Sequence, residues 1–331
     1  MKLECYTYTS AEVSSVDPNG KVLVIGGSGF VGANVLNRLI QDGIKAIGFD
    51  VALPPPILNH KIKVVKGDML DLPHLLHTIN HYGIKGIIHT SAIMPSTGSE
   101  VSPTRTMRIN VEGTLNVLEA ARLAHLKRVV FCSTVAACGS YGLVKVREDD
   151  PPKYPFGWIY GLSKFTAEQI CVHYLENFGV DVVTVRFTNV FGPGQRPFRK
   201  PFIAGAQMID WFVQSAVKEG KIELDGVRDT EKDFTYVSDV VEGVLLAYEK
   251  EKLQHRLFNI SSGKLTSTEE IIDVIAELLP NVSINVGPGV EEVLPYFDIS
   301  RAEEELGYHP KYDLKRAITE YIEWLKSQPQ P

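Results

Sequence analysis

The chain has 331 residues, of which 44% are hydrophobic and 22% charged, a composition typical of globular proteins with a large buried core. Its net charge of −6 gives no electrostatic reason to expect a nucleic-acid partner or an anionic membrane surface. No apolar run approaches the ~20 residues that cross a bilayer, and the N-terminus lacks the basic and apolar stretches of a signal peptide.

The first 190 or so residues alternate short β-branched runs with helical stretches, a pattern typical of parallel βαβ units. Strands are expected at residues 21–25, 46–50, 62–65, 86–90, 129–133 and 181–187. Helices are expected at residues 32–42, 110–124 and 163–177. Because crossovers between parallel strands are right-handed, these units predict an α/β fold of Rossmann type with a doubly wound parallel sheet.

After about residue 192 the character of the sequence changes. Segment 192–201 holds three prolines and two glycines and is predicted as a loop. Segments 233–248 and 257–260 look like sheet and helix material again, and helices are expected at 267–279 and 314–326. We therefore predict a Rossmann domain of residues 18–192 plus 233–260 and a smaller mixed domain of residues 193–232 plus 261–331. We assign no role to the N-terminal extension, residues 1–17.

Four cysteines, Cys5, Cys132, Cys138 and Cys171, form no CxxC pair and no His/Cys metal-binding spacing. Most of them sit in apolar surroundings, which predicts reduced, buried thiols and no metal. A reducing compartment follows, and together with the absence of a signal peptide it indicates a cytoplasmic protein.

A glycine-rich turn runs directly from the first expected strand into the first expected helix. Gly26, Gly29 and Gly32 allow a tight turn, close approach of the backbone to a pyrophosphate, and close packing of helix on strand. The pyrophosphate would then lie on the N–H groups of the helix N-terminus, around Phe30 and Val31. The position between strand and helix makes this pattern indicative of a dinucleotide site.

Asp50 ends the second expected strand, 24 residues after Gly26. A carboxylate there accepts hydrogen bonds from a ribose 2′-hydroxyl and repels a 2′-phosphate, so the sequence favours NAD over NADP. Asp68 and Met69 follow the third expected strand, at the edge of the sheet where adenine would lie. Asp68 also fits a helix N-cap before Leu70, and both roles could hold.

Tyr160 and Lys164 lie four residues apart, on one face of the start of a helix. Ser133 and Thr134 end the preceding apolar strand and therefore lie at the carboxyl edge of the sheet. A tyrosine loses its proton near pH 10, but Lys164 and a positive nicotinamide ring would favour the phenolate, so Tyr160 is the expected general base. Thr134, or Ser133, would hydrogen-bond the reacting oxygen.

From about residue 20 to 326 the chain resembles an extended short-chain dehydrogenase/reductase of the NAD-dependent epimerase/dehydratase family. The matching segments are 26–32, 67–68, 88–92, 110–114, 131–139, 160–164, 186–194, 233–237, 258–263 and 298–302. The resemblance implies a catalytic triad of Thr134, Tyr160 and Lys164, with Lys164 also contacting the nicotinamide ribose and Asn110 in a structural role. It also implies a homodimer formed through the helices at 110–124 and 163–177.

The departures from the family concern the substrate. Residues 135–137 read Val-Ala-Ala where family dehydratases and decarboxylases carry carboxylates, so dehydration and decarboxylation are not expected. Of the two arginines with which the family holds a diphosphate, the first is replaced by Lys232, a point charge rather than a bidentate fork. The second has no counterpart, because residues 257–300 contain no arginine and segment 289–293 is acidic. Cys138 also stands where a tyrosine is usual.

Candidate substrate contacts are Ser133, Asn189, Arg196 and Lys232, and the loop that holds Arg196 also carries Arg199 and Lys200. We expect the smaller domain to bind a small, carbohydrate-like substrate. The missing arginines favour net oxidation or reduction of a secondary alcohol or ketone of a sugar or sugar-derived molecule. The alternatives are an NAD-dependent epimerase of (nucleotide-)sugars, such as a UDP-sugar 4-epimerase, and a protein that binds NAD without turnover.

Overall fold

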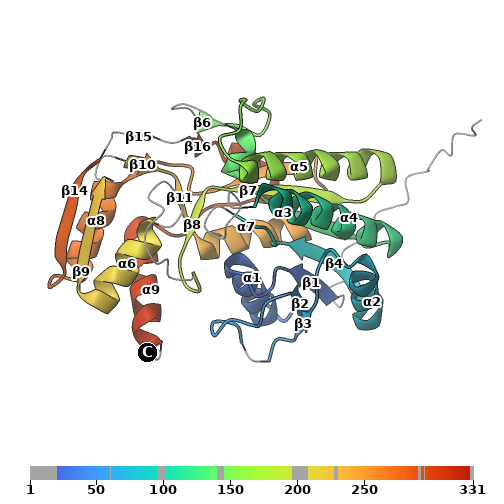
Figure 1. Cartoon of the computed structure of the whole chain (residues 1–331), viewed down its shortest axis with the longest axis horizontal. Coiled ribbons are helices and arrows are strands. Elements are labelled where there is room, and N and C mark those ends of the chain that lie inside the picture. Colours follow the sequence, from blue (N-terminus) through green and yellow to red (C-terminus); the bar gives the residue numbers. More distant parts are fainter. Residues whose placement is uncertain are drawn as a thin grey trace, which may run out of the picture.

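A computed structural model describes residues 21–59, 61–94, 102–139, 145–195, 208–226, 230–289, 292–293 and 295–328. Within these residues, seven parallel strands form the central sheet (Figure 1). Their order across the sheet is β12 (Leu257–Ile260), β7 (Val182–Phe187), β5 (Arg128–Thr134), β4 (Ile84–His89), β1 (Lys21–Ile25), β2 (Ala46–Asp50) and β3 (Val64–Lys66). The chain reverses direction across the sheet between β3 and β4, which creates the switch point where Rossmann-type folds bind dinucleotides.

Successive side chains along each strand point to opposite faces of the sheet and pack into two separate hydrophobic cores. Val22 and Val24 face the helices α1 (Phe30–Gln41) and α7 (Val237–Glu249), whereas Leu23 and Ile25 face α2 (Leu72–Tyr82), α4 (Gly113–Leu123) and α5 (Ile159–Phe178). Both faces of a parallel sheet are covered in this way, which is why its strands are apolar throughout rather than alternating. The predicted doubly wound α/β fold is confirmed.

Several helices differ from the prediction, and α5 begins at Ile159 rather than at residue 163. The helix expected at 110–124 begins earlier, as α3 (Pro103–Met107), continues through a π-helical turn (Arg108–Glu112) and ends with α4. Proline at the first helical position is favourable because its missing N–H has no partner there in any case. Helix α2 was not predicted, although Asp71 caps it by accepting from the His74 N–H and Gly83 ends it in the left-handed conformation.

A second cluster of elements lies beside one end of the sheet (Figure 1). It holds α6 (Met208–Glu219), α8 (Thr268–Leu278) and α9 (Leu314–Ser327), together with the paired strands β9 (Lys221–Gly226) and β14 (Ser283–Gly289). Phe212, Ile275 and Tyr321 are fully buried in its own apolar core. We keep the two-domain division as a proposal, which this separate core supports.

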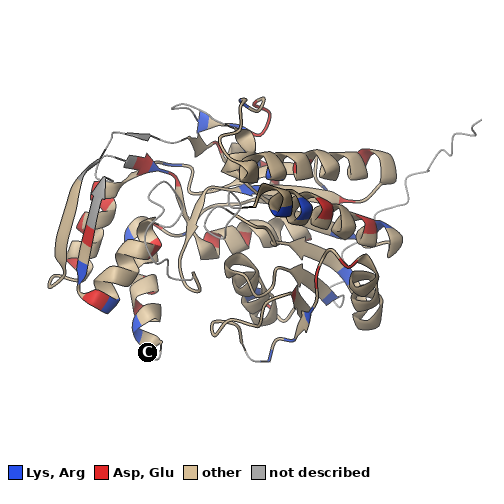
Figure 2. Cartoon of the chain, viewed as in Figure 1, with Lys and Arg blue, Asp and Glu red and all other residues tan. Residues whose placement is uncertain are grey.

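Short strand pairs connect the two clusters. They are β8 (Asn189–Phe191) with β11 (Phe234–Tyr236), β6 (Lys145–Val146) with β16 (Tyr296–Phe297), and β10 (Thr230–Lys232) with β13 (Thr266–Ser267) and β15 (Glu292–Val293). Basic and acidic residues are interspersed over both clusters (Figure 2). Among the described helices, none is long and apolar enough to span a membrane.

Candidate active site

The glycine turn after β1 leaves no room for side chains at two of its positions. Gly26 has a φ of +82°, and a Cβ atom added there would lie 2.7 Å from the backbone nitrogen of Ser91. A Cβ at Gly32 would lie 2.1 Å from the carbonyl oxygen of Gly26. The turn is closed by a hydrogen bond from the Gly29 N–H to the Gly26 carbonyl, 2.9 Å long. Gly29 itself is exposed, so the outer side of the turn is open to the close approach of a pyrophosphate.

Helix α1 begins directly from this turn. Gly29 is its N-cap, and no side chain caps the first N–H groups of the helix. These groups have no partner within the helix and carry the positive end of its dipole. The position and the chemistry of this helix start fit the pyrophosphate of a dinucleotide.

Asp50 lies at the end of β2, beside the glycine turn. Its carboxylate accepts from the Ser28 N–H at 3.0 Å and from the Ala52 N–H at 2.9 Å. These two bonds leave lone pairs on both carboxylate oxygens for further donors. Asp50 is therefore fixed in position and able to accept from ribose hydroxyls, as NAD binding requires.

Asp68 and Met69 lie in the turn after β3. The Asp68 carboxylate accepts from the Leu70 N–H at 2.9 Å, whereas the cap of helix α2 is Asp71 rather than Asp68. The Met69 side chain is buried and lies close to Gly113 of α4. Met69 thus packs in the core beneath the cofactor edge, and a role toward NAD stays a proposal for both residues.

Thr134 ends strand β5, and Tyr160 lies in the first turn of α5. The Thr134 hydroxyl accepts from the Ala136 N–H at 3.3 Å and also hydrogen-bonds the phenol of Tyr160. Burial raises the pKa of Tyr160 to about 12, and the hydrogen bond with Thr134 opposes this rise. We predicted a lowered pKa with Lys164 and a nicotinamide beside the phenol. In the chain alone burial outweighs every other influence, so the phenol is protonated at neutral pH.

Lys164 lies one helical turn after Tyr160 and is almost fully buried. Its Nζ donates to the carbonyl oxygen of Cys132 at 2.7 Å and lies 4.0 Å from the centre of the Phe131 ring. Burial lowers the pKa of Lys164 to about 8. The ammonium is therefore anchored on β5, the strand that carries Thr134.

Ser133 has a partner of its own. Its hydroxyl donates at 2.5 Å to the carboxylate of Glu168, which is buried and also binds Arg186. Because this hydrogen atom is already engaged, the geometry favours Thr134 over Ser133 as the hydroxyl that meets a substrate.

The other candidate substrate contacts lie on strands that connect the two clusters. Asn189 begins β8 and donates through its side-chain nitrogen to the carbonyl of Asp233 at 2.9 Å. Lys232 ends β10 and is fully buried, pairing in register with Thr266. Arg196, with Arg199 and Lys200, lies outside the described residues.

Two residues of this region were not assigned a contact from the sequence. The Thr90 hydroxyl, directly after β4, donates to the Ile25 carbonyl at 2.9 Å and so holds the glycine turn. Asn110, expected only to be structural, bonds both the N–H and the carbonyl of Ile93 and donates to the Ser163 hydroxyl. The sequence places Thr90 at the carboxyl end of an expected parallel strand, and this position could have indicated its contact with the glycine turn.

Comparison with known proteins agrees with this geometry. The model of the "NAD dependent epimerase/dehydratase family" matches residues 22–261. A putative UDP-glucose 4-epimerase from Methanocaldococcus jannaschii is 31% identical, over 92% of this chain and 98% of that protein.

Solved structures show the same fold. The UDP-glucose 4-epimerase from Brucella ovis in complex with NAD has a TM-score of 0.79 and 25% identity, and the match covers 92% of this chain and 98% of that one. The UDP-glucose 4-epimerase from Thermotoga maritima with UDP-glucose has a TM-score of 0.80 and 24% identity, with coverage of 92% and 98%.

Proposed function

The chain belongs to the NAD-dependent epimerase/dehydratase family and is an enzyme, and from this premise we propose that it epimerises a carbinol carbon of a nucleotide-linked sugar. Net oxidation or reduction was our first expectation from the sequence. The similarity to UDP-glucose 4-epimerases along almost the whole chain favours the alternative that we kept beside it.

The similarity thus favours epimerisation, and the observation that supports hydride transfer is the arrangement at the end of β5. Thr134 and Tyr160 hydrogen-bond each other, and Lys164 is anchored on the same strand. The next turn, Val135–Cys138, has no acidic or basic side chain, and Ala137 and Cys138 are buried in it. Because elimination and decarboxylation need an additional proton-transferring group, this site supports hydride chemistry alone.

NAD fits the residues at the switch point. The glycine turn and the first N–H groups of α1 would hold its pyrophosphate, and Asp50 would hold the adenine-side ribose hydroxyls. Lys164 would contact the other ribose. When bound, NAD supplies a site that accepts a hydride and later returns it.

Residues of the chain transfer the hydroxyl proton of the substrate. Thr134 donates to the oxygen of the reacting carbinol and holds it beside Tyr160. Tyr160 removes the hydroxyl proton as the carbinol hydrogen leaves with its electron pair, and a ketone remains. For this step the pKa of Tyr160 must fall well below 12, which a positive charge next to the phenol achieves. Tyr160 returns the proton after the ketone has turned its other face.

The nucleotide part of the substrate would lie toward the smaller cluster. We keep Asn189, Lys232 and Arg196 as proposed contacts of a diphosphate or carboxylate. Lys232 offers a compact positive charge in place of the bidentate arginine fork, so we expect weaker binding of the diphosphate than an arginine would give.

The test of the function is to supply UDP-hexoses and free sugars and to follow both epimer formation and NADH absorbance. We expect epimers to form without NADH release, and the purified protein to retain NAD through dialysis. Stoichiometric NADH release with a free sugar or aldonate would support the dehydrogenase instead. NAD binding without either product would support the non-catalytic alternative.

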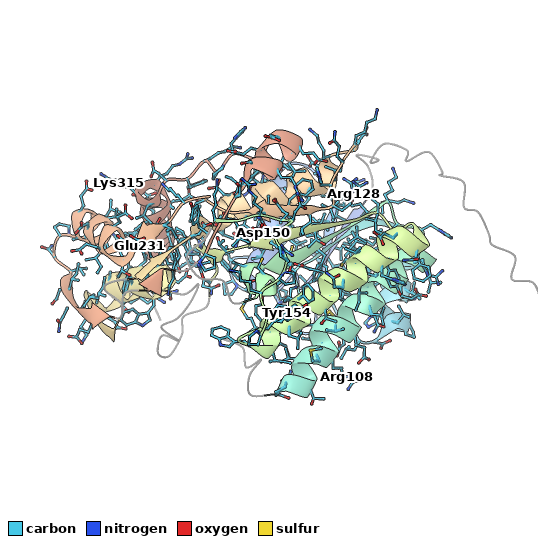
Figure 3. The ribbon with its side chains drawn as sticks, turned by 90° about the horizontal axis from the view of Figure 1, so that it is seen from above. Arg108, Arg128, Asp150, Tyr154, Glu231 and Lys315 are labelled. Carbon is cyan, nitrogen blue, oxygen red and sulfur yellow. The ribbon has the colours of Figure 1, made fainter. Side chains whose placement is uncertain are left out.

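We also propose a homodimer. Apolar side chains of α4 and α5 are 37–50% exposed, namely Leu115, Leu123, Leu162, Val172 and Phe178. The two helices pack against each other and lie side by side when the molecule is seen from above, with Arg108 and Tyr154 near the same end (Figure 3). An apolar surface of this kind on two adjacent helices fits a second copy of the chain.

A further inference from the structure

A buried ion pair between Glu168 of α5 and Arg186 of β7 lies next to the end of strand β5, where Ser133 also bonds Glu168. The Glu168 carboxylate accepts the Ser133 hydroxyl at 2.5 Å and a bidentate pair from Arg186, with Nε at 2.9 Å and Nη2 at 2.7 Å. The exposed fractions are 4% for Ser133, 3% for Glu168 and 6% for Arg186. A carboxylate so deeply buried is tolerated only because its oxygens are paired in this way.

The same contacts join three elements next to the reacting groups. Ser133 and Arg186 are register partners on the neighbouring strands β5 and β7, and Glu168 spans both from helix α5. Ser133 directly precedes Thr134. Glu168 therefore links the end of β5, next to Thr134, to α5, the helix that carries Tyr160 and Lys164.

Glu168 also interacts electrostatically with Lys164, which lies one helical turn earlier on α5. Burial lowers the pKa of Lys164, and Coulomb interactions with Cys132, Glu168 and Cys171 oppose that change. Within the part of the chain that the structure describes, the other titratable groups that interact with Lys164 are His89 of β4, Cys132 of β5 and Cys171 of α5.

These other groups are neutral near pH 7. Burial lowers the pKa of His89 to about 3 and raises that of Cys132 to about 12, and burial also raises the pKa of Cys171. Tyr160, one turn earlier on the same helix, is protonated as well. Glu168 is thus the negative charge that acts on the buried ammonium, although Arg186 offsets part of it.

We propose that Glu168 is a positioning residue that holds the ends of β5 and β7 together and retains the positive charge of Lys164. It acts through Thr134 and Lys164 rather than on the substrate. The consequence for catalysis rests on the proposed function, because Lys164 matters only where a dinucleotide and Tyr160 take part. Loss of the Lys164 charge would then set the alkaline limit of activity.

The experiment measures the titration of Lys164 directly in the full-length protein. Lysine labelled with ¹³C at Cε gives one signal per residue, and the Lys164 signal is identified by its loss in Lys164→Met. In the wild type we expect a midpoint of about pH 8. In Glu168→Gln the midpoint should fall by about one pH unit, which is the lower end of the effect of a nearby opposite charge because Arg186 remains.

Two matched variants separate charge from structure. Ser133→Ala removes the hydrogen bond and keeps the carboxylate, so its Lys164 midpoint should stay at the wild-type value. Glu168→Asp keeps the charge on a shorter side chain and should also keep the midpoint, even if the end of β5 moves and kcat falls. If Glu168→Gln does not fold, a Lys164 midpoint that differs from the wild type in Glu168→Asp or in Ser133→Ala still overturns the proposal.

The alkaline limit of kcat should move with the midpoint in Glu168→Gln alone. An unchanged midpoint in Glu168→Gln, or an equal fall in Ser133→Ala or Glu168→Asp, would overturn the proposal. The midpoint is read without substrate, so failure of the epimerase assignment leaves this comparison intact.

Discussion

At the residue scale, the proposed mechanism depends on two side chains whose pKa values burial moves in opposite directions. Burial raises the pKa of Tyr160 to about 12 and lowers that of Lys164 to about 8. In both cases the neutral form is favoured, since a low-dielectric interior penalises charge. Such pairs are frequent where a protein prepares groups for proton transfer.

Tyr160→Phe tests the role of the phenol. Removing the hydroxyl should lower turnover by about 10²- to 10⁴-fold, the usual contribution of a positioned acid–base group, while the NAD content of the purified protein stays unchanged. Tyr174→Phe is the matched control, because Tyr174 lies on the same helix and donates to Glu119 at 3.1 Å, away from the site. Activity lost equally in both variants would refute the proposed mechanism.

Lys164→Met tests what the buried ammonium costs in stability. The folded-state pKa of Lys164 is lowered from 10.5 to about 8, so between these values the unfolded chain binds a proton that the folded chain does not. Stability contributed by this group therefore rises as pH increases from 8 to 10.5 and is lost as pH falls through 8.

We expect the free energy of unfolding of the methionine variant, relative to the wild type, to be higher at pH 7 than at pH 10. The difference should be at most about 3 kcal/mol, as each pKa unit corresponds to about 1.4 kcal/mol. Denaturant unfolding at the two pH values measures it, and a pH-independent difference would argue against a buried charge at this position.

At the element scale, the start of α1 combines a packing requirement with a binding one. The glycines at 26 and 32 bring strand, turn and helix together so closely that backbone atoms fill the place of a Cβ. The same absence of side chains exposes the N–H groups of the helix. Close packing and anion binding therefore follow from one local sequence.

Gly32→Ala should abolish NAD retention and lower stability by about 1–3 kcal/mol, because the new Cβ would lie 2.1 Å from the Gly26 carbonyl. Gly83→Ala is the control. Gly83 has a positive φ of 63°, but nothing lies within 4 Å of its missing Cβ, so we expect a loss of about 1 kcal/mol and normal NAD content. NAD content and thermal unfolding report both effects. Full NAD content in Gly32→Ala would show that the turn does not hold the pyrophosphate.

At the scale of the whole molecule, the central sheet with its helices and the cluster that has its own apolar core meet at the strands β8 and β11. Asp233 is fully buried at this junction, where it binds Ser262, the Phe297 N–H and, through its carbonyl, Asn189. Of the proposed nucleotide contacts, Asn189 begins β8 and Lys232 directly precedes Asp233, whereas Thr134 ends β5 of the central sheet. A substrate bound between them would touch both clusters, as ligands of doubly wound folds commonly do.

The proposed dimer is tested by charge introduced on the apolar surface of α4 and α5. A variant carrying Leu115→Arg and Val172→Arg should sediment as a monomer. In a two-fold interface each arginine occurs once in each copy, so every new charge is buried twice in an apolar contact. Leu53→Arg is the control, since Leu53 is even more exposed but follows β2. Equal sedimentation of both variants and the wild type would contradict the proposed interface.

The sequence by itself determined the features that depend on local pattern. The order of strands and helices, the glycine turn, Asp50, and the spacing of Tyr160 and Lys164 are read from neighbouring residues, and local periodicity reports them. Helices α2 and α6 were not predicted, although the caps of α2 at Asp71 and Gly83 are visible in the sequence.

Only the tertiary structure decided how the site residues are paired and how strongly they ionise. Glu168 carries no local signal, yet it joins Ser133 and Arg186 across two strands and a helix. The direction of the Tyr160 pKa was also beyond the sequence, because it depends on burial by segments far apart in the chain. The hydrogen-bond partner of a side chain and the dielectric constant around it are properties of the folded interior. The spacing of residues in the sequence reports neither of them.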